Sequence, residues 1–218
     1  MNLCDSRQRS SQPSRMVPIE KRLQEAPGRL TSVEYVAKGG GVSPQIALDS
    51  NVLSYLVEAM ATGYDPEEDN HAALRDQRVA AFRIFLYVGN LFVTPTAHRE
   101  AEKISDQARR SYHEAVKNVL LSELVGLDED RVEARAEALL GFHPHESDCR
   151  IVAEAELGGL THLLTFDAKM FARLEGETRV ELTAASEFWT RIDLPRGSRP
   201  RWEPRSDNPL STVDWWHW

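Results

Sequence analysis

The sequence predicts an α/β fold in which a central, mainly parallel sheet is flanked by helices. Short apolar or β-branched runs occur at residues 46–48, 91–94 and 161–165. After each run, apolar residues recur at the three- and four-residue spacing of a helix. Successive parallel strands need a long crossover, usually a helix, so this alternation favours a parallel sheet. Hydrophobic residues make up 41% of the chain, which is sufficient for a core.

The length of 218 residues favours one domain with tails. We expect this domain at residues 44–194. Residues 1–43 are rich in Ser, Gln, Arg and Pro and contain three successive glycines, which is typical of a flexible lead. Residues 195–218 form a basic segment rich in Pro and Trp. Its tryptophans would be unfavourable in water, so we expect it to pack on its own body or on a partner.

Charge and composition exclude several classes of function. The net charge of -8 argues against broad, sequence-independent binding of duplex nucleic acid. The sequence has no apolar run of membrane-spanning length and no secretory signal, so a cytoplasmic protein without a membrane partner is expected. Cys4 and Cys149 form neither a disulfide framework nor a zinc-ligand set and are expected to be free thiols.

The first predicted strand, at residues 46–48, ends in Asp49. Residues 52, 53, 56, 57 and 60 are then apolar, which predicts a helix directly after it. Ligands of an open α/β sheet bind beyond the carboxyl ends of the strands, where Asp49 would point. A simple helix cap is the alternative, because Asp is a common capping residue.

A polar loop at residues 63–70 separates that helix from a second one, which spans residues 74 to about 88. Its cluster of acids is expected to be a solvated loop. The strand at residues 91–94 stops at Pro95, and the following helix contains Glu100. Glu100 is therefore a second candidate for chemistry. The alternative is an acid that merely stabilises a helix N-terminus through the helix dipole.

The rest of the chain continues the alternation. Helices are predicted at residues 107–121, 129–140 and 143–159, with a turn near Gly126. Arg109, Arg110 and Lys117 lie on the first of these helices, where they form either a solvated basic face or a phosphate contact. Asp148 aligns with apolar positions that should pack on the sheet. A strand at 161–167 delivers Thr165 and Asp167, before a helix at 168–174, a strand at 178–182 and a helix at 184–192.

Four acids are thus expected at one end of a single sheet: Asp49, Glu100, Asp148 and Asp167. Such a group of like charges repels strongly unless a cation joins it. A hard divalent cation with oxygen ligands, Mg²⁺ or Mn²⁺, is the simplest answer. The seven histidines show no zinc-binding spacing and are interpreted as ordinary polar residues.

The sequence resembles the PIN domain nucleases, which include the toxin ribonucleases of bacterial type II toxin-antitoxin systems. The resemblance covers residues 46 to about 192 and rests on four motifs in this order. They are residues 46–53 around Asp49, Glu100 after Thr94 and Pro95, residues 148–153 starting at Asp148, and residues 163–167 ending in Asp167. It implies a PIN-like three-layer sandwich, so that residues 44–194 would be a nuclease domain.

The resemblance also implies a function, that of a metal-dependent endoribonuclease which hydrolyses RNA phosphodiester bonds, as the toxin of a toxin-antitoxin pair does. Asp49 and Asp167 would bind Mg²⁺ or Mn²⁺ most directly, and Glu100 and Asp148 would complete this catalytic site. Asn51 and Thr165 would orient ligands and substrate. RNA is then the expected substrate, and an antitoxin, another protein partner and a homodimer are further expectations.

Two other functions are compatible with the fold class. A phosphatase of the haloacid dehalogenase type also begins with an Asp at the end of a strand. It needs a second Asp two residues later, where this chain has Asn51.

The second alternative is a non-catalytic module on the PIN scaffold that binds RNA or protein. It stays open because function resides in the site rather than in the fold, so that a scaffold of this type need not be an enzyme.

Overall fold

The structure is a computed structural model that describes residues 44–62, 64–67, 69–107, 110–111, 113–114, 116, 121–203, 206 and 209–218. The predicted lead at residues 1–43, with Cys4, lies outside these residues, as do Arg109 and Lys117. Cys149 is a free, buried thiol, as expected. The described elements are β1 (Ile46–Leu48), α2 (Ser50–Thr62), α3 (Ala72–Tyr87), β2 (Leu91–Val93), α4 (Pro95–Glu102), β3 (Ser122–Glu123), α6 (Glu129–Leu140), α7 (Glu146–Leu157), β4 (His162–Leu164), α8 (Ala168–Leu174), β5 (Glu181–Thr183), α9 (Ala185–Arg191) and the 3-10 helix η1 (Pro209–Thr212).

The strands form one parallel sheet with the order β3-β2-β1-β4-β5. This confirms the predicted α/β class with a parallel sheet flanked by helices. Strand β1 lies at the centre, and its three residues are almost completely buried. A strand that is covered on both faces reads as a continuous apolar run, which explains the sequence pattern of residues 46–48.

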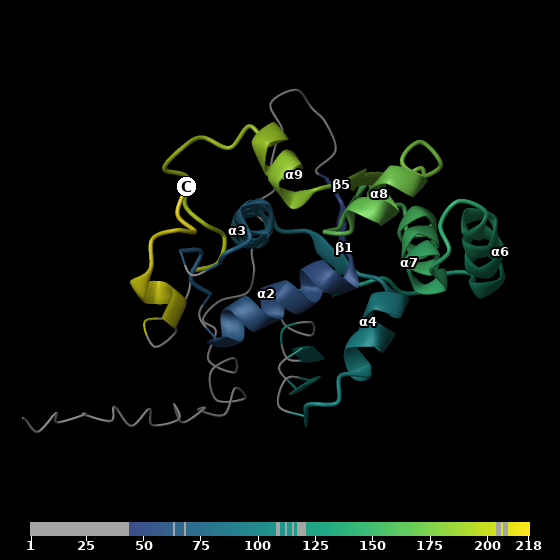
Figure 1. The fold of residues 1–218 in the computed structure, drawn as a ribbon, viewed down its shortest axis with the longest axis horizontal. Coiled ribbons are helices and arrows are strands. Elements are labelled where there is room, and N and C mark those ends of the chain that lie inside the picture. The colour runs from purple at the N-terminus through teal and green to yellow at the C-terminus, as the bar shows by residue number, and fades with distance from the viewer. Residues whose placement is uncertain are drawn as a thin grey trace, which may run out of the picture.

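The helices pack on both sides of the strands. In Figure 1, α3 and α9 lie together on one side, and α6, α7 and α8 lie on the other. Helix α2 contacts α3 and also α4, and α4 in turn contacts α7. None of the helices in the described ranges is long and apolar enough to cross a membrane.

One strand was not predicted, and some predicted boundaries were wrong. Strand β3 was not predicted, because its two exposed polar residues at the sheet edge carry no apolar alternation. The predicted helix at 143–159 begins only at Glu146, because His145 has extended backbone angles (φ -94°, ψ 110°). The last strand is Glu181–Thr183 rather than residues 178–182. Of the predicted helix at 107–121, residues 107, 110, 111, 113, 114, 116 and 121 are described. The first six are helical, and residue 121 is not.

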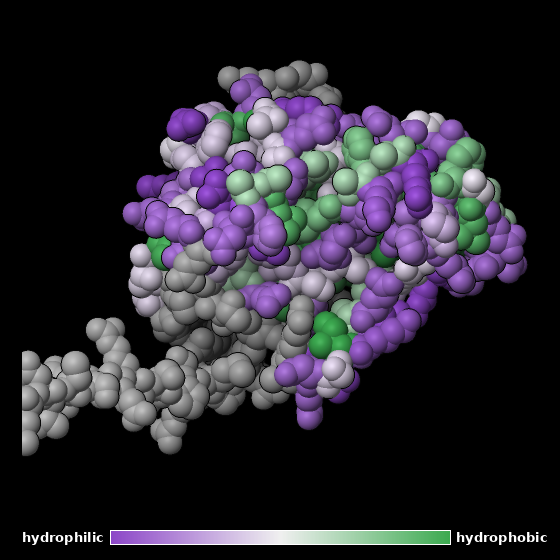
Figure 2. Space-filling view, in the orientation of Figure 1, coloured by the Kyte–Doolittle hydropathy of each residue, from purple (hydrophilic) through white to green (hydrophobic). Residues whose placement is uncertain are grey.

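The Trp-rich C-terminal segment packs on the body of the protein. Trp216 and Leu210 are buried in the core. The ring of Trp218 lies 5.0 Å from that of Trp189 on α9, and Arg196 stands over it at 4.9 Å. Small hydrophobic areas among mostly hydrophilic side chains mark the face shown in Figure 2. The aromatic rings of this segment therefore serve mainly as core.

Gly89 joins this segment to the sheet. It precedes β2 with a φ of +69°, and Arg201 of the C-terminal segment lies against it and donates from Nη1 to the carbonyl oxygen of Val88 (2.7 Å). A Cβ atom at residue 89 would stand 1.8 Å from that Nη1. Only glycine satisfies both the backbone angle and this close approach.

We expect Gly89→Ala to lower the free energy of unfolding more than Gly126→Ala does. Gly126 has a similar φ of +73°, but nothing lies within 4 Å of the place that a Cβ atom would take there. Both variants should lose about 1–2 kcal/mol from the left-handed backbone. Gly89→Ala should lose about 1 kcal/mol more with the Arg201 hydrogen bond. Urea unfolding of both variants tests this, and equal losses would contradict the role given to Arg201.

Candidate active site

The register of the strands brings three strand ends to one level. Leu48 pairs with Val93 on one side and with Leu164 on the other. The residues that follow these positions therefore emerge at one edge of the sheet. The chain runs from β1 outward to β2 and β3 and then returns to place β4 on the other side of β1. This reversal creates a topological switch point between β1 and β4, which is where open α/β sheets bind ligands.

Asp49 lies at this switch point and is 4% exposed. Its backbone N–H donates to the carbonyl oxygen of Leu164 (3.0 Å), which extends the pairing of β1 with β4. One side-chain oxygen, Oδ1, accepts from the N–H of Ser50 (2.7 Å), and the other, Oδ2, accepts from the hydroxyl of Thr165 (2.8 Å). The carboxylate thus bridges two strands in addition to standing at the start of α2, so it does more than cap that helix.

The surroundings of Asp49 disfavour its negative charge. Burial raises the pKa of Asp49 to about 6, although the hydrogen bonds from Thr165 and Ser50 lower it. The charges of Asp148 and Glu100 raise this pKa further. Two of the other predicted acids therefore lie within electrostatic reach of Asp49. A strongly perturbed acid at a switch point is a typical mark of a functional site.

Glu100 reaches this group through Ser50, whose hydroxyl donates to Oε2 of Glu100. No sequence pattern indicated the link between Ser50 and Glu100, because the two residues lie 50 positions apart. Glu100 does not belong to the first turn of α4, which carries no acid. The alternative that Glu100 only stabilises the N-terminus of α4 is therefore wrong.

Asp167 stands beside Asp49 through Thr165. The hydroxyl oxygen of Thr165 donates to Asp49 and accepts from the N–H of Asp167 (3.0 Å). Asp167 also caps α8, because its Oδ1 accepts from the N–H groups of Lys169 and Met170. Burial raises the pKa of Asp167, but these two hydrogen bonds and the charges of His143 and Lys169 outweigh it, so that the pKa is lowered overall.

Asn51 holds the loop that carries these groups. Its Oδ1 accepts from the N–H of Phe166 (3.3 Å), between Thr165 and Asp167. Asn51 and Thr165 therefore connect the start of α2 to the end of β4. The sequence predicted both as orienting residues, and their hydrogen bonds are of the kind that fixes the acids relative to each other.

Asp148 lies in the first turn of α7 and is held by His143. The Nε2 atom of His143 lies 2.7 Å from Oδ2 of Asp148. His143 is completely buried, and its charge acts on Asp167 as well. In the sequence, His143 was interpreted as an ordinary polar residue. Its placement five residues before Asp148, next to a proline at a helix start, was the only local signal.

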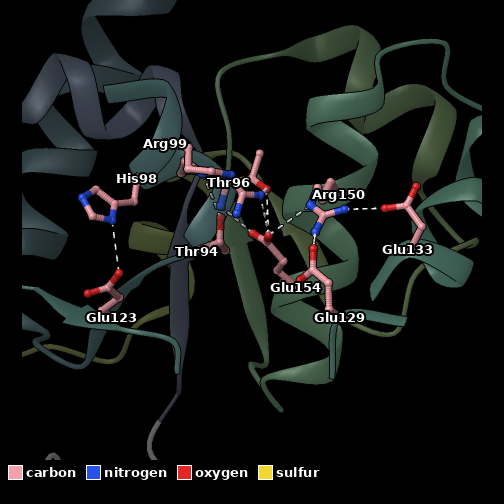
Figure 3. Close-up of polar contacts among 10 residues, drawn as sticks. Thr94, Thr96, His98, Arg99, Glu123, Glu129, Glu133, Arg150 and Glu154 are labelled. Carbon is pink, nitrogen blue, oxygen red and sulfur yellow. Dashed lines mark hydrogen bonds and ion pairs between the residues drawn. The ribbon is translucent and has the colours of Figure 1, made fainter. Parts of the chain in front are cut away.

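A second polar cluster fixes α4 against α7, and Figure 3 shows it. Its centre is Glu154, which is 1% exposed and accepts from the N–H (2.8 Å) and the hydroxyl (2.7 Å) of Thr96. Arg99 and Arg150 each lie 3.5 Å from Oε1 of Glu154, and Arg150 continues outward to Glu129 and Glu133. Glu154 thereby sets the distance between the helices that carry Glu100 and Asp148. No sequence pattern singled it out.

The donor chemistry of the four acids fits Mg²⁺ or Mn²⁺. Asp148 Oδ1, Glu100 Oε1 and Asp167 Oδ2 accept no hydrogen bond from any residue that the structure describes. These are hard oxygen donors with unused lone pairs beside a carboxylate whose charge is disfavoured. Within the described ranges, no group of three or more His, Cys, Asp and Glu side chains is already arranged to hold a metal ion. The side chains would have to converge further around a cation.

Comparison with known proteins adds no further assignment: no family model matches the chain, and no curated protein matches it. The geometry of the acid group is therefore the basis on which a function can be assigned.

The raised pKa of Asp49 predicts a specific dependence of stability on pH. The pKa of about 6 in the folded protein exceeds the ordinary value of 3.8. Between these values the folded state holds the proton more tightly, so the free energy of unfolding falls as the pH rises from about 4 to 6. The loss amounts to about 3 kcal/mol, at about 1.4 kcal/mol per pKa unit.

Asp49→Asn should remove this loss and be more stable than the wild type at pH 7, but not at pH 4. Chemical unfolding of both proteins across this range, without divalent cations, measures the difference. A difference that does not change with pH would show that Asp49 titrates normally.

Glu154→Ala should lower the free energy of unfolding by about 3–5 kcal/mol, because it leaves the buried N–H and hydroxyl of Thr96 without their acceptor and removes the carboxylate shared by Arg99 and Arg150. Glu133 is the matched control, since it pairs with the same Arg150 but its side chain is 54% exposed. Glu133→Ala should cost less than about 1 kcal/mol. Guanidinium unfolding of the two variants checks this, and similar losses would argue against Glu154 as the link between α4 and α7.

Proposed function

We propose that this protein is a metal-dependent endoribonuclease of the PIN type, in which Asp49, Glu100, Asp148 and Asp167 form the catalytic site. One observation carries the proposal: Asp49 is buried at the switch point, with its pKa raised by burial and by the charges of Asp148 and Glu100. Proteins seldom bury a carboxyl group beside other acids for stability alone. A cation that binds there would lower the pKa of Asp49 and offset the repulsion.

The proposed chemistry is hydrolysis of an RNA phosphodiester. The oxygen of water forms a bond to phosphorus, the bond from phosphorus to the leaving oxygen breaks, and that oxygen leaves with a proton. Mg²⁺ or Mn²⁺, held by the four acids, would supply an activated water and offset charge on the phosphate. The protein itself contributes orientation: Thr165 and Ser50 fix the carboxylates of Asp49 and Glu100, and Asn51 fixes the loop before Asp167.

RNA is the proposed substrate. An antitoxin or other protein partner, a homodimer and a role as the toxin of a toxin-antitoxin pair stay predictions from the resemblance. A non-catalytic module could bind RNA by stacking bases on the tryptophans of the C-terminal segment. Trp189 and Trp216 are buried, and Trp202, Trp215 and Trp218 pack against the core, so these rings offer limited support for it.

Purified full-length protein should cut RNA only when Mg²⁺ or Mn²⁺ is present. A panel of single-stranded and structured RNAs, incubated with each metal or with EDTA, measures this. Asp49→Asn and Asp167→Asn should each lower the cleavage rate at least about 100-fold. Loss of a residue that only supports a metal ligand lowers activity by up to about 100-fold, and loss of a ligand itself should cost no less.

Glu137→Gln is the matched control, because Glu137 is an exposed acid of α6. It should cut like the wild type. No cutting with either metal, by protein that circular dichroism shows to be folded, would overturn the proposal and favour the non-catalytic module. Cutting that survives in Asp49→Asn would exclude this acid group as the site.

A further inference from the structure

His143 occupies the loop between α6 and α7, and its backbone is held from both sides. Its N–H donates to the carbonyl oxygen of Leu139 at the end of α6 (3.0 Å). Its own carbonyl oxygen accepts from the thiol of Cys149 on α7 (3.2 Å). The ring is completely buried, so the imidazole has little freedom to turn away from its contacts.

The hydrogen-bonding pattern of the ring defines what His143 can do. Nε2 faces Oδ2 of Asp148 at 2.7 Å, whereas Nδ1 is buried and has no hydrogen-bond partner within the described residues. An ionised carboxylate can only accept, so the hydrogen must reside on Nε2. The side chain of His143 therefore makes one hydrogen bond, and that bond is a donation to Asp148.

A purely structural histidine does not explain this arrangement well. Buried polar groups generally satisfy their hydrogen bonds within the core. His143 instead leaves one nitrogen unused and directs the other to a partly exposed acid of the candidate site. This single bond occupies Oδ2 of Asp148, while Oδ1 accepts no hydrogen bond from the described part of the chain. The two oxygens of Asp148 are thereby made unequal.

We propose that His143 is a positioning residue that orients Asp148 for the divalent cation of the proposed nuclease site. The hydrogen from Nε2 holds Oδ2, which leaves Oδ1 available to a cation near Asp49, on which the charge of Asp148 already acts. The inference rests on the proposed function, because it assigns Asp148 to a cation. Partners that fix a ligating side chain in this way commonly contribute about 10–100-fold to metal affinity.

Two substitutions of His143 distinguish the effect of its hydrogen bond from the effect of its side-chain volume. His143→Gln retains an N–H donor at nearly the position of Nε2, whereas His143→Met fills similar space without a donor. Mn²⁺ binding to the full-length proteins, measured by isothermal titration calorimetry, is the readout. We expect His143→Met to bind Mn²⁺ about 10–100-fold more weakly than the wild type. His143→Gln should stay within about threefold, the usual context-dependence of such contributions.

A double-mutant cycle with Asp148→Asn adds a second measurement. If His143 acts through Asp148, His143→Met should have no further effect on Mn²⁺ affinity in the Asp148→Asn background. His143→Leu replaces His143→Met if the latter is less than fully folded by thermal unfolding. Equal Mn²⁺ affinity of the wild type and the apolar variant, or equal weakening by His143→Gln and the apolar variant, would overturn the positioning role.

The outcomes also distinguish this inference from the proposed function. A wild type that binds Mn²⁺ and cuts RNA, together with an unaffected His143→Met, would leave the nuclease proposal standing and remove His143 from it. A folded wild type that neither binds Mn²⁺ nor cuts RNA would overturn both.

Discussion

The burial of Asp49 at the end of β1 is the constraint on which the rest of the site depends. Parallel pairing on both sides of β1 leaves Asp49, the residue that follows the strand, almost without access to bulk water. Asp148 and Glu100 then approach from α7 and α4 and oppose ionisation of the same carboxylate. An arrangement of this kind costs stability at neutral pH, and proteins commonly retain such costs at functional sites.

A set of hydrogen-bond donors stabilises the carboxylates of this arrangement. Thr165 serves Asp49, Ser50 serves Glu100 and His143 serves Asp148. Each donor comes from a different part of the chain, and each leaves further lone pairs of its carboxylate unused. Fully paired acids would be structural ion pairs, whereas partly paired acids remain able to bind a cation. Farther from the site, Glu154 holds the two helices that bring Glu100 and Asp148 together.

Much of this site could be predicted from residue order alone. Asp49 and Asp167 follow apolar strands, and this local signal predicts their place at the carboxyl edge. Asn51 and Thr165 are close to those acids in sequence, so their place beside the acids could be predicted as well, whereas the orienting role proposed for them comes from the resemblance. His143, Ser50 and Glu154 were missed or interpreted differently, because their partners are set by helix packing and by the route of the loop between α6 and α7.

The alternation of strands and helices is determined by the local sequence, because apolar periodicity and turn residues act over short distances along the chain. The position of the acids after the strands is equally local. The charge state of Asp49, in contrast, arises only in the packed fold, because it depends on burial and on acids located 51 and 99 positions away. The same is true of the Trp-rich segment, since Trp216 is buried in the core and Trp218 contacts α3 and α9 only in the folded chain. Long-range packing of this kind leaves no periodic signal in the chain.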